Sequence, residues 1–156
     1  YTSRFLTLTK GTGVINRIFH GYGKFEGEMD GRKNGALISM ANGKAVAFAI
    51  FNLQARGEMF VTHNDPVYEG MIVGLAPKAG DMIINVMKGK QLTNMRTQGT
   101  DENVVLTPVR QMSIAEQLSM LNTDEALEIT PKSLRLRKAI LNPTDRKKNE
   151  KSGTPL

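Results

Sequence analysis

Residues 88–102 carry side chains that are suited to binding phosphates and sugars. From residue 85 to residue 99 the segment has three cationic side chains, no acidic one, and several amide and hydroxyl donors. These side chains are Lys88, Lys90, Gln91, Thr93, Asn94, Arg96, Thr97 and Gln98. Proteins use such cations and neutral donors to contact nucleic-acid backbones. The segment contains no aromatic residue, which favours backbone contacts on a folded RNA over stacking on single-stranded bases.

The residues after position 131 hold the whole excess of positive charge. The net charge is +6, and residues 132–156 contain eight Lys or Arg residues against two acidic ones. Leu134 and Leu136 alternate with Arg135 and Arg137, which predicts a strand with one buried face and one cationic face. A basic end indicates an acidic partner, most often a nucleic acid or an anionic membrane surface, unless it is only a solvated terminus.

Catalytic chemistry has little support in the sequence. His20 and His63 are the only histidines, and neither belongs to a metal-ligand spacing. His63 with Asp65 could act as a base and its orienting acid, but no nucleophile in a recognisable setting accompanies them. The glycine pairs at residues 11–13 and 21–23 do not match a phosphate-binding loop. We therefore expect no enzymatic activity, no metal and no cofactor in this chain.

Short β-strands are expected to position both cationic segments. Residues 36–40 and 45–51 flank Asn42-Gly43, a dipeptide that fits the tight turn of a β-hairpin. Further strand-like runs follow up to residue 107 and are separated by turn signals, which favours a small barrel or a curled antiparallel sheet. Residues 88–102 would then form a long loop between two strands, and such loops are usually functional or disordered.

Helices are predicted at three places. Residues 1–10 have helical periodicity and end at Gly11. Ser113 begins a capping box for a helix that reaches about Asn122, and three apolar side chains are expected to face the core, namely Ile114, Leu118 and Leu121. A third helix begins at Asn142-Pro143 and leads into a basic tail, residues 142–156, which we expect to be partly disordered.

The first 35 residues indicate a boundary between two domains. Residues 14–19 predict a strand, and five glycines follow between residues 21 and 35. Because the first residue is Tyr1 rather than Met, we expect a piece of a longer protein. The sequence has no apolar run of 18 residues, no secretory signal and no cysteine. These absences predict a soluble, cytoplasmic protein without a membrane span.

Four sequence motifs resemble the C-terminal part of the TypA/BipA family of ribosome-associated GTPases, which are similar to elongation factor G. The motifs are residues 67–74 (VYEGMIVG), 90–96 (KQLTNMR), 99–102 (GTDE) and 130–138 (TPKSLRLRK). Further matching segments at residues 5–13, 31–35 and 43–49 extend the resemblance over nearly the whole chain.

The resemblance implies an α+β fold in three parts. Residues 1–30 would be the last helix and strand of a ferredoxin-like domain, residues 31–141 a strand-rich domain peculiar to the family, and residues 142–156 the basic tail. The GTPase domain, with its GTP and Mg²⁺, would lie outside these 156 residues. In the family a long loop approaches the large ribosomal subunit near the peptidyl-transferase centre, next to the acceptor arm of A-site tRNA. By residue match that loop is residues 88–102.

The sequence therefore predicts an RNA-binding anchor on the ribosome, monomeric and without a catalytic role. The candidate RNA-binding residues are Lys88, Gly89, Lys90, Gln91, Thr93, Asn94, Arg96, Gly99, Thr100, Arg135, Arg137 and Lys138. Two alternatives stay open. One is a protein-interaction module that uses the hairpin edge or the capped helix, and the other is a hydrolase that uses His63 and Asp65.

Overall fold

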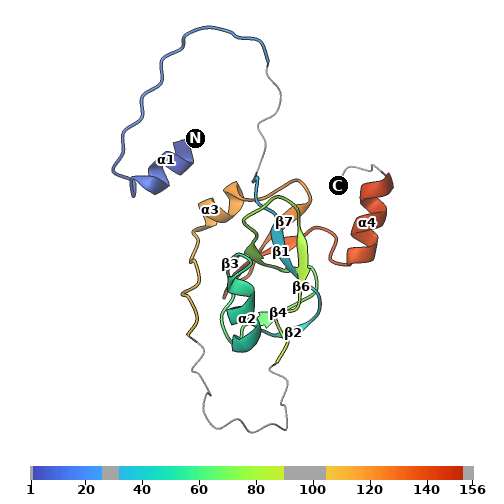
Figure 1. The fold of residues 1–156 in the computed structure, drawn as a ribbon. Coiled ribbons are helices and arrows are strands. Elements are labelled where there is room, and N and C mark those ends of the chain that lie inside the picture. The colour runs from blue at the N-terminus through green and yellow to red at the C-terminus, as the bar shows by residue number, and fades with distance from the viewer. Residues whose placement is uncertain (1, 26–31, 90–104, 153–156) are drawn as a thin grey trace, which may run out of the picture.

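The computed structural model describes residues 2–25, 32–89 and 105–152, and within them the chain forms four helices and eight strands (Figure 1). The elements are α1 (Thr2–Leu8), β1 (Ala36–Ser39), β2 (Gly43–Lys44), α2 (Ala47–Gln54), β3 (Glu58–Met59), β4 (Pro66–Val67), β5 (Ile72–Leu75), β6 (Met82–Ile84), α3 (Ile114–Ser119), β7 (Glu125–Ile129), β8 (Leu134–Lys138) and α4 (Pro143–Ser152). The strands form one sheet of four strands and two sheets of two. The α+β class is confirmed, whereas no sheet in the described part closes into a barrel.

The four-stranded sheet separates two core clusters. Its strand order is β3-β5-β1-β6, and β1 runs antiparallel to β5 and parallel to β6. Successive side chains of a strand point to opposite faces. Leu37 therefore joins the first core cluster together with α2, while Ile38 joins the second core cluster together with Leu136 of β8. Every residue of β1 is buried because both faces of the sheet are covered.

Residues 45–51 lie mostly in a helix, so the predicted hairpin across Asn42-Gly43 is wrong. Helix α2 buries Ala49, Ile50 and Leu53, a spacing that places all three on one helical face. Alanine also has the highest helix propensity, and residues 47 and 49 of this helix are alanines. The turn instead leads into the two-residue strand β2, which pairs with β4.

The N-terminal segment matches the prediction only in its helix. Helix α1 is present and closes at Gly11, which has φ +80° and donates its N–H to the Leu6 carbonyl at 2.8 Å. Residues 14–19 form no strand, and Val14 and Ile18 are 83% and 93% exposed. A strand needs a partner for its backbone groups, and none lies beside this segment in the described residues. The ferredoxin-like start and the domain boundaries stay predictions.

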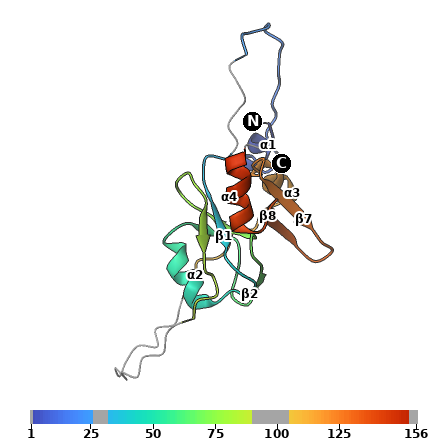
Figure 2. The same cartoon turned by 90° about the vertical axis from the view of Figure 1, so that its right-hand side faces the viewer.

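The C-terminal elements follow the local sequence signals closely. The strand predicted from the alternation at residues 134–137 is present as β8, and it pairs antiparallel with β7, with Glu128 opposite Arg135. The capping box is confirmed, because the Ser113 hydroxyl accepts from the Glu116 N–H at 3.3 Å and the Glu116 carboxylate accepts from the Ser113 N–H at 2.9 Å. Helix α4 stands to one side of the sheets in Figure 1 and crosses in front of β1 in the turned view of Figure 2. It buries no residue and extends the described part of the tail in helical form to Ser152.

The face that α3 turns toward the core differs from the prediction. Ile114 and Leu118 are 48% and 53% exposed, whereas Gln117 is buried and Leu121 packs against the second core cluster. Helix α3 has only six residues, so where it docks determines which face is covered. The predicted orientation of Ile114 and Leu118 is therefore wrong, and that of Leu121 is confirmed.

Candidate nucleic-acid interface

Both ends of the predicted RNA-binding loop are attached to the first core cluster. Val86 is fully buried in that cluster just before the loop, and Leu106 packs against the cluster just after it. Thr107 is also fixed to α2, since its carbonyl accepts from the Gln54 amide at 2.9 Å and its N–H donates to Gln54 Oε1 at 3.2 Å. The two ends consequently leave the same part of the domain, close to α2 (Figure 1).

Two of the predicted loop contacts are placed by the structure. Lys88 and Gly89 are exposed, as a contact with an external ligand requires. The other candidates of the loop lie outside the described residues and stay predictions: Lys90, Gln91, Thr93, Asn94, Arg96, Gly99 and Thr100.

Lys138 does not belong to the cationic surface, which corrects its place among the candidate residues. Its ammonium forms salt bridges of 2.5 Å to Asp81, 2.6 Å to Asp124 and 3.0 Å to Glu125, and its side chain is 2% exposed. The alternation of strand side chains puts residue 138 on the same face as Leu134 and Leu136. The period that predicted the buried leucines thus also places Lys138 in the interior.

Asp81, which is partly shielded from solvent, and the buried Lys138 both keep their charge. Burial disfavours the Asp81 carboxylate, but the Ala36 N–H at 2.7 Å and the Lys138 ammonium outweigh it and hold the pKa of Asp81 below its ordinary value. Burial likewise disfavours the Lys138 ammonium, yet its hydrogen bonds to Asp124, Asp81 and Glu125 raise the pKa of Lys138. Asp81 and Lys138 are therefore both ionised, and their salt bridge is structural.

Arg135 and Arg137 lie on the other face of β8, where the prediction placed them. The Arg135 guanidinium pairs with Glu128 at 3.3 Å, and Arg137 donates to the Lys138 carbonyl at 3.1 Å. Both side chains are partly exposed. Partly exposed pairs of this length leave donors available to an external anion.

Tyr68 completes this face from the neighbouring loop. Its hydroxyl donates to the second oxygen of Glu128 at 2.5 Å, so that Glu128 joins Tyr68 to Arg135. Burial raises the pKa of Tyr68 to about 12, and the hydrogen bond and negative charge of Glu128 act in the same direction. The phenol is therefore neutral, and donates to Glu128, at all pH values below that range.

Tyr68 is expected to ionise in a distinct step near pH 12. A spectrophotometric titration of phenolate absorbance should show this step in the unaltered chain, and Tyr68→Phe should remove it. Glu128→Gln should move the step to lower pH, because the negative charge that opposes ionisation is gone. If Tyr68→Phe leaves the absorbance change around pH 12 intact, the pairing with Glu128 is incorrect.

His63 and Asp65 both serve the local backbone. His63 Nδ1 accepts from the N–H of Ala47 at 3.2 Å, at the start of α2. The Asp65 carboxylate accepts from the N–H and the hydroxyl of Thr62 at 2.6 and 2.9 Å. These contacts explain both residues as parts of turns. Among the described residues, no group of three or more His, Asp or Glu side chains could hold a metal ion, and no helix is long and apolar enough to cross a membrane.

The prediction missed three polar residues that meet at one hollow beside β8. Arg110, Gln117 and Lys132 line it together with Arg135. Gln117 gives the one available sequence signal, since it lies four residues before the core-facing Leu121 and so on the same helical face. Arg110 and Lys132 are exposed residues in irregular segments, where no helix or strand periodicity indicates which way a side chain faces.

Comparisons of the chain with a family model and with curated proteins indicate the same family. A family model described as TypA/BipA C-terminal domain matches residues 34–143. The chain is 46% identical, over 100% of its length and 26% of the relative, to a Buchnera aphidicola (subsp. Schizaphis graminum) protein named large ribosomal subunit assembly factor BipA. Proteins of the same name from Salmonella typhimurium and Escherichia coli strain K12 are also 46% identical, over 95% of this chain and 24% of each relative. The chain thus spans about a quarter of the length of these curated relatives.

Proposed function

The chain belongs to the TypA/BipA C-terminal domain family, and from this premise we propose that it binds RNA and anchors a translational GTPase on the large ribosomal subunit. The proposed contact is the loop of residues 88–102, next to ribosomal RNA and the acceptor arm of A-site tRNA. The relatives are named as assembly factors of the same subunit, which supports a ribosomal partner.

The observation that carries this proposal is a cationic, acid-free segment between two ends held by one core cluster. Val86 and Leu106 attach those ends to the first core cluster, and Lys88 is exposed beside one of them. A rigid base of this kind can direct side chains toward phosphates, which proteins contact to fix their position on an RNA. The partly exposed side chains of Arg135 and Arg137 and the basic helix α4 would add secondary contacts.

In this proposal, GTP hydrolysis belongs to a domain outside these 156 residues. The 156 residues contain no P-loop sequence, so the chain holds no GTPase domain. GTP and Mg²⁺ would be bound by the domain that carries that loop, and the present residues would hold the factor in place.

Removing the three cations of the loop is expected to weaken ribosome binding. Lys88→Ala, Lys90→Ala and Arg96→Ala together should lower the affinity at least about tenfold, because charge-assisted hydrogen bonds to phosphates are lost. They should also flatten the dependence of log affinity on log salt by about one unit for each lost contact. Co-sedimentation of the chain with large subunits over a range of salt concentrations measures both effects.

A matched variant separates a local effect from a change in net charge. Lys33→Ala, Arg17→Ala and Lys78→Ala also remove two lysines and one arginine, all exposed and all outside residues 88–102. This control should bind nearly as the unaltered chain does. Equal affinity and equal salt slope for the loop variant and the unaltered chain would contradict the proposal.

A protein-interaction module is the second candidate, because Ile114 and Leu118 leave an apolar face on the capped helix α3. This candidate predicts that binding survives when ribosomal RNA is digested. Co-sedimentation before and after nuclease treatment, with ribosomal proteins kept in complex, distinguishes the two.

A further inference from the structure

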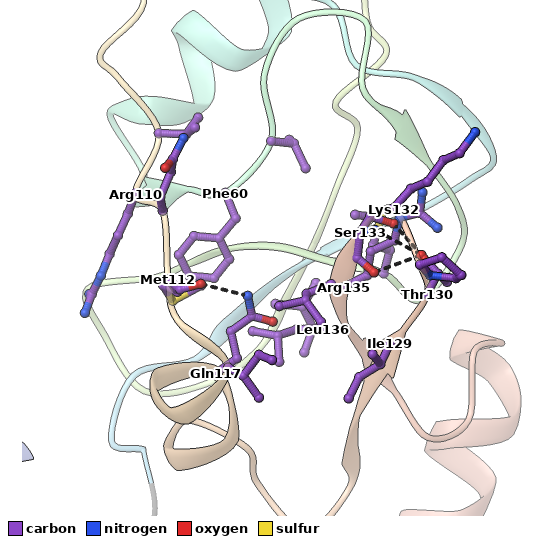
Figure 3. A pocket seen from close by; sticks show the side chains of 18 residues that line it. Phe60, Arg110, Met112, Gln117, Ile129, Thr130, Lys132, Ser133, Arg135 and Leu136 are labelled. Atoms are coloured by element: carbon purple, nitrogen blue, oxygen red, sulfur yellow. Dashed lines mark hydrogen bonds between the residues drawn. The ribbon is translucent and has the colours of Figure 1, made fainter. Parts of the chain in front are cut away.

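A hollow opens between the β7–β8 hairpin, helix α3 and the irregular segment before that helix. Its volume is ≈ 790 Å³, which lies within the range of small-molecule and cofactor sites. Figure 3 shows the labelled side chains that surround it, with Phe60 and Met112 on one side and Ile129 on the other. Phe60 and Met112 both pack against the second core cluster, so they give the hollow an apolar floor.

Gln117 presents an unused hydrogen-bond acceptor in this hollow. The residue is 8% exposed, and its amide nitrogen donates to the Met112 carbonyl at 3.3 Å. Since a carbonyl can only accept, this bond fixes which end of the amide is nitrogen. Gln117 Oε1 is buried without a hydrogen-bond partner in the described part of the chain, and Figure 3 shows it turned toward the hairpin. Buried polar atoms are normally paired with a protein group or with water, so Gln117 Oε1 can accept from a donor that enters the hollow.

The rim of the hollow is cationic. Arg110, Lys132 and Arg135 line it, and no Asp or Glu is among its lining residues. Lys132 forms no salt bridge within the described residues and lies at the hairpin tip, where Thr130 and Ser133 exchange hydrogen bonds of 2.9 to 3.0 Å. Arg110 and Arg135 pair with carboxylates only at 3.3 to 3.5 Å. The rim therefore suits an anionic occupant.

A nucleotide satisfies these conditions together. Its base has apolar faces for Phe60 and Met112, its amino or ring N–H can donate to Gln117 Oε1, and its phosphate matches Lys132 and Arg135. A phosphate alone has no donor for Gln117, and an apolar peptide side chain has neither donor nor charge. We propose that this hollow binds one nucleobase of RNA turned out of its stack, with the adjoining phosphate on Lys132 and Arg135. The proposal rests on the proposed function and adds a base-reading contact to it.

An RNA hairpin with one bulged adenosine, compared with the same hairpin carrying an abasic bulge, tests the occupant. Fluorescence anisotropy with the 156-residue chain should show that the hairpin with the adenosine bulge binds about tenfold tighter than the abasic one. This is the affinity that stacking of one base contributes. Gln117→Met should remove most of this preference, because methionine keeps the volume and lacks the acceptor. Lys132→Ala should weaken binding of both RNAs alike and flatten the salt slope by about one unit. Lys78→Ala, at an exposed lysine outside the proposed contacts, should leave the affinity and the base preference unchanged.

Photocrosslinking of the unaltered chain to large subunits gives a readout that needs no variant. We expect crosslinks to a base at Phe60 or Met112. Crosslinks confined to residues 88–102 would overturn the base site and leave the proposed function intact, and none at either place would overturn both. Equal affinity for the two hairpins, or binding of an acidic peptide or free adenosine monophosphate without binding of RNA, would also overturn the base site.

Discussion

Glu125→Gln is expected to lower the free energy of unfolding by about 3–5 kcal/mol, because it leaves the buried Arg32 guanidinium without a carboxylate, whereas Lys138 keeps Asp81 and Asp124. Glu125 is fully buried and pairs with Arg32 at 2.7 Å and with Lys138 at 3.0 Å. The Arg32 side chain is only 6% exposed and the Lys138 side chain 2%. Glutamine has nearly the same volume, so the loss reports on charge and not on packing.

Glu150→Gln is the matched control for this substitution. It makes the same chemical change at an exposed position of helix α4 and should alter stability by less than about 0.5 kcal/mol. Urea unfolding followed by circular dichroism gives both values. A loss below about 1 kcal/mol for Glu125→Gln would mean that water or another acceptor compensates the Arg32 guanidinium, and would contradict the buried cluster.

The large expected effect follows from the number of segments that meet at Glu125. Arg32 comes just before β1, Asp81 just before β6, Glu125 begins β7, and Lys138 ends β8. Their pairs span sequence separations of up to 93 residues. The cluster therefore attaches the hairpin to the four-stranded sheet, and any displacement of the hairpin would also alter the hollow that Gln117 lines.

Leu37→Ala is expected to cost about 2–5 kcal/mol of stability because it leaves a cavity in the first core cluster. Leu37 is fully buried on β1, between β5 and β6. Thermal and urea unfolding should both report the loss. Leu37 is a core residue and is not among the predicted RNA-binding residues. Ribosome binding by the folded fraction of the variant should therefore persist.

Leu118→Ala provides the comparison for Leu37→Ala. Sequence periodicity predicts Leu118 as a core residue, yet its side chain is 53% exposed. We expect its replacement to change stability by less than about 1 kcal/mol. Similar losses for the two variants would show that α3 packs through Leu118 in solution, contrary to the structure.

Local signals account for the parts of the fold that were predicted correctly. The capping box of Ser113 and Glu116, the helix start at Asn142 and the alternation along β8 each involve neighbouring residues whose interactions form within a few residues of chain. The family was likewise recognisable from contiguous motifs, and the comparisons bear it out. The ribosomal contacts of the loop remain predictions.

The errors occurred where the covered face depends on distant elements. Residues 45–51 are apolar throughout, and a run of this length fits a buried strand or a buried helix until its neighbours are known. Residues 14–19 have strand-like composition but no partner in the described part of the chain. Ile114 and Leu118 face solvent because α3 docks through Gln117 and Leu121.

By itself, the sequence determined the family, the class of fold, the cationic segments and the elements that are stabilised by local hydrogen bonds. Only the tertiary structure decided that Lys138 is an interior residue, that Glu125 and Arg32 meet, and that Gln117, Lys132 and Arg135 surround one hollow. The physical reason is that charge and hydrogen-bonding capacity are properties of a side chain, whereas burial and pairing depend on which distant segments the fold brings beside it.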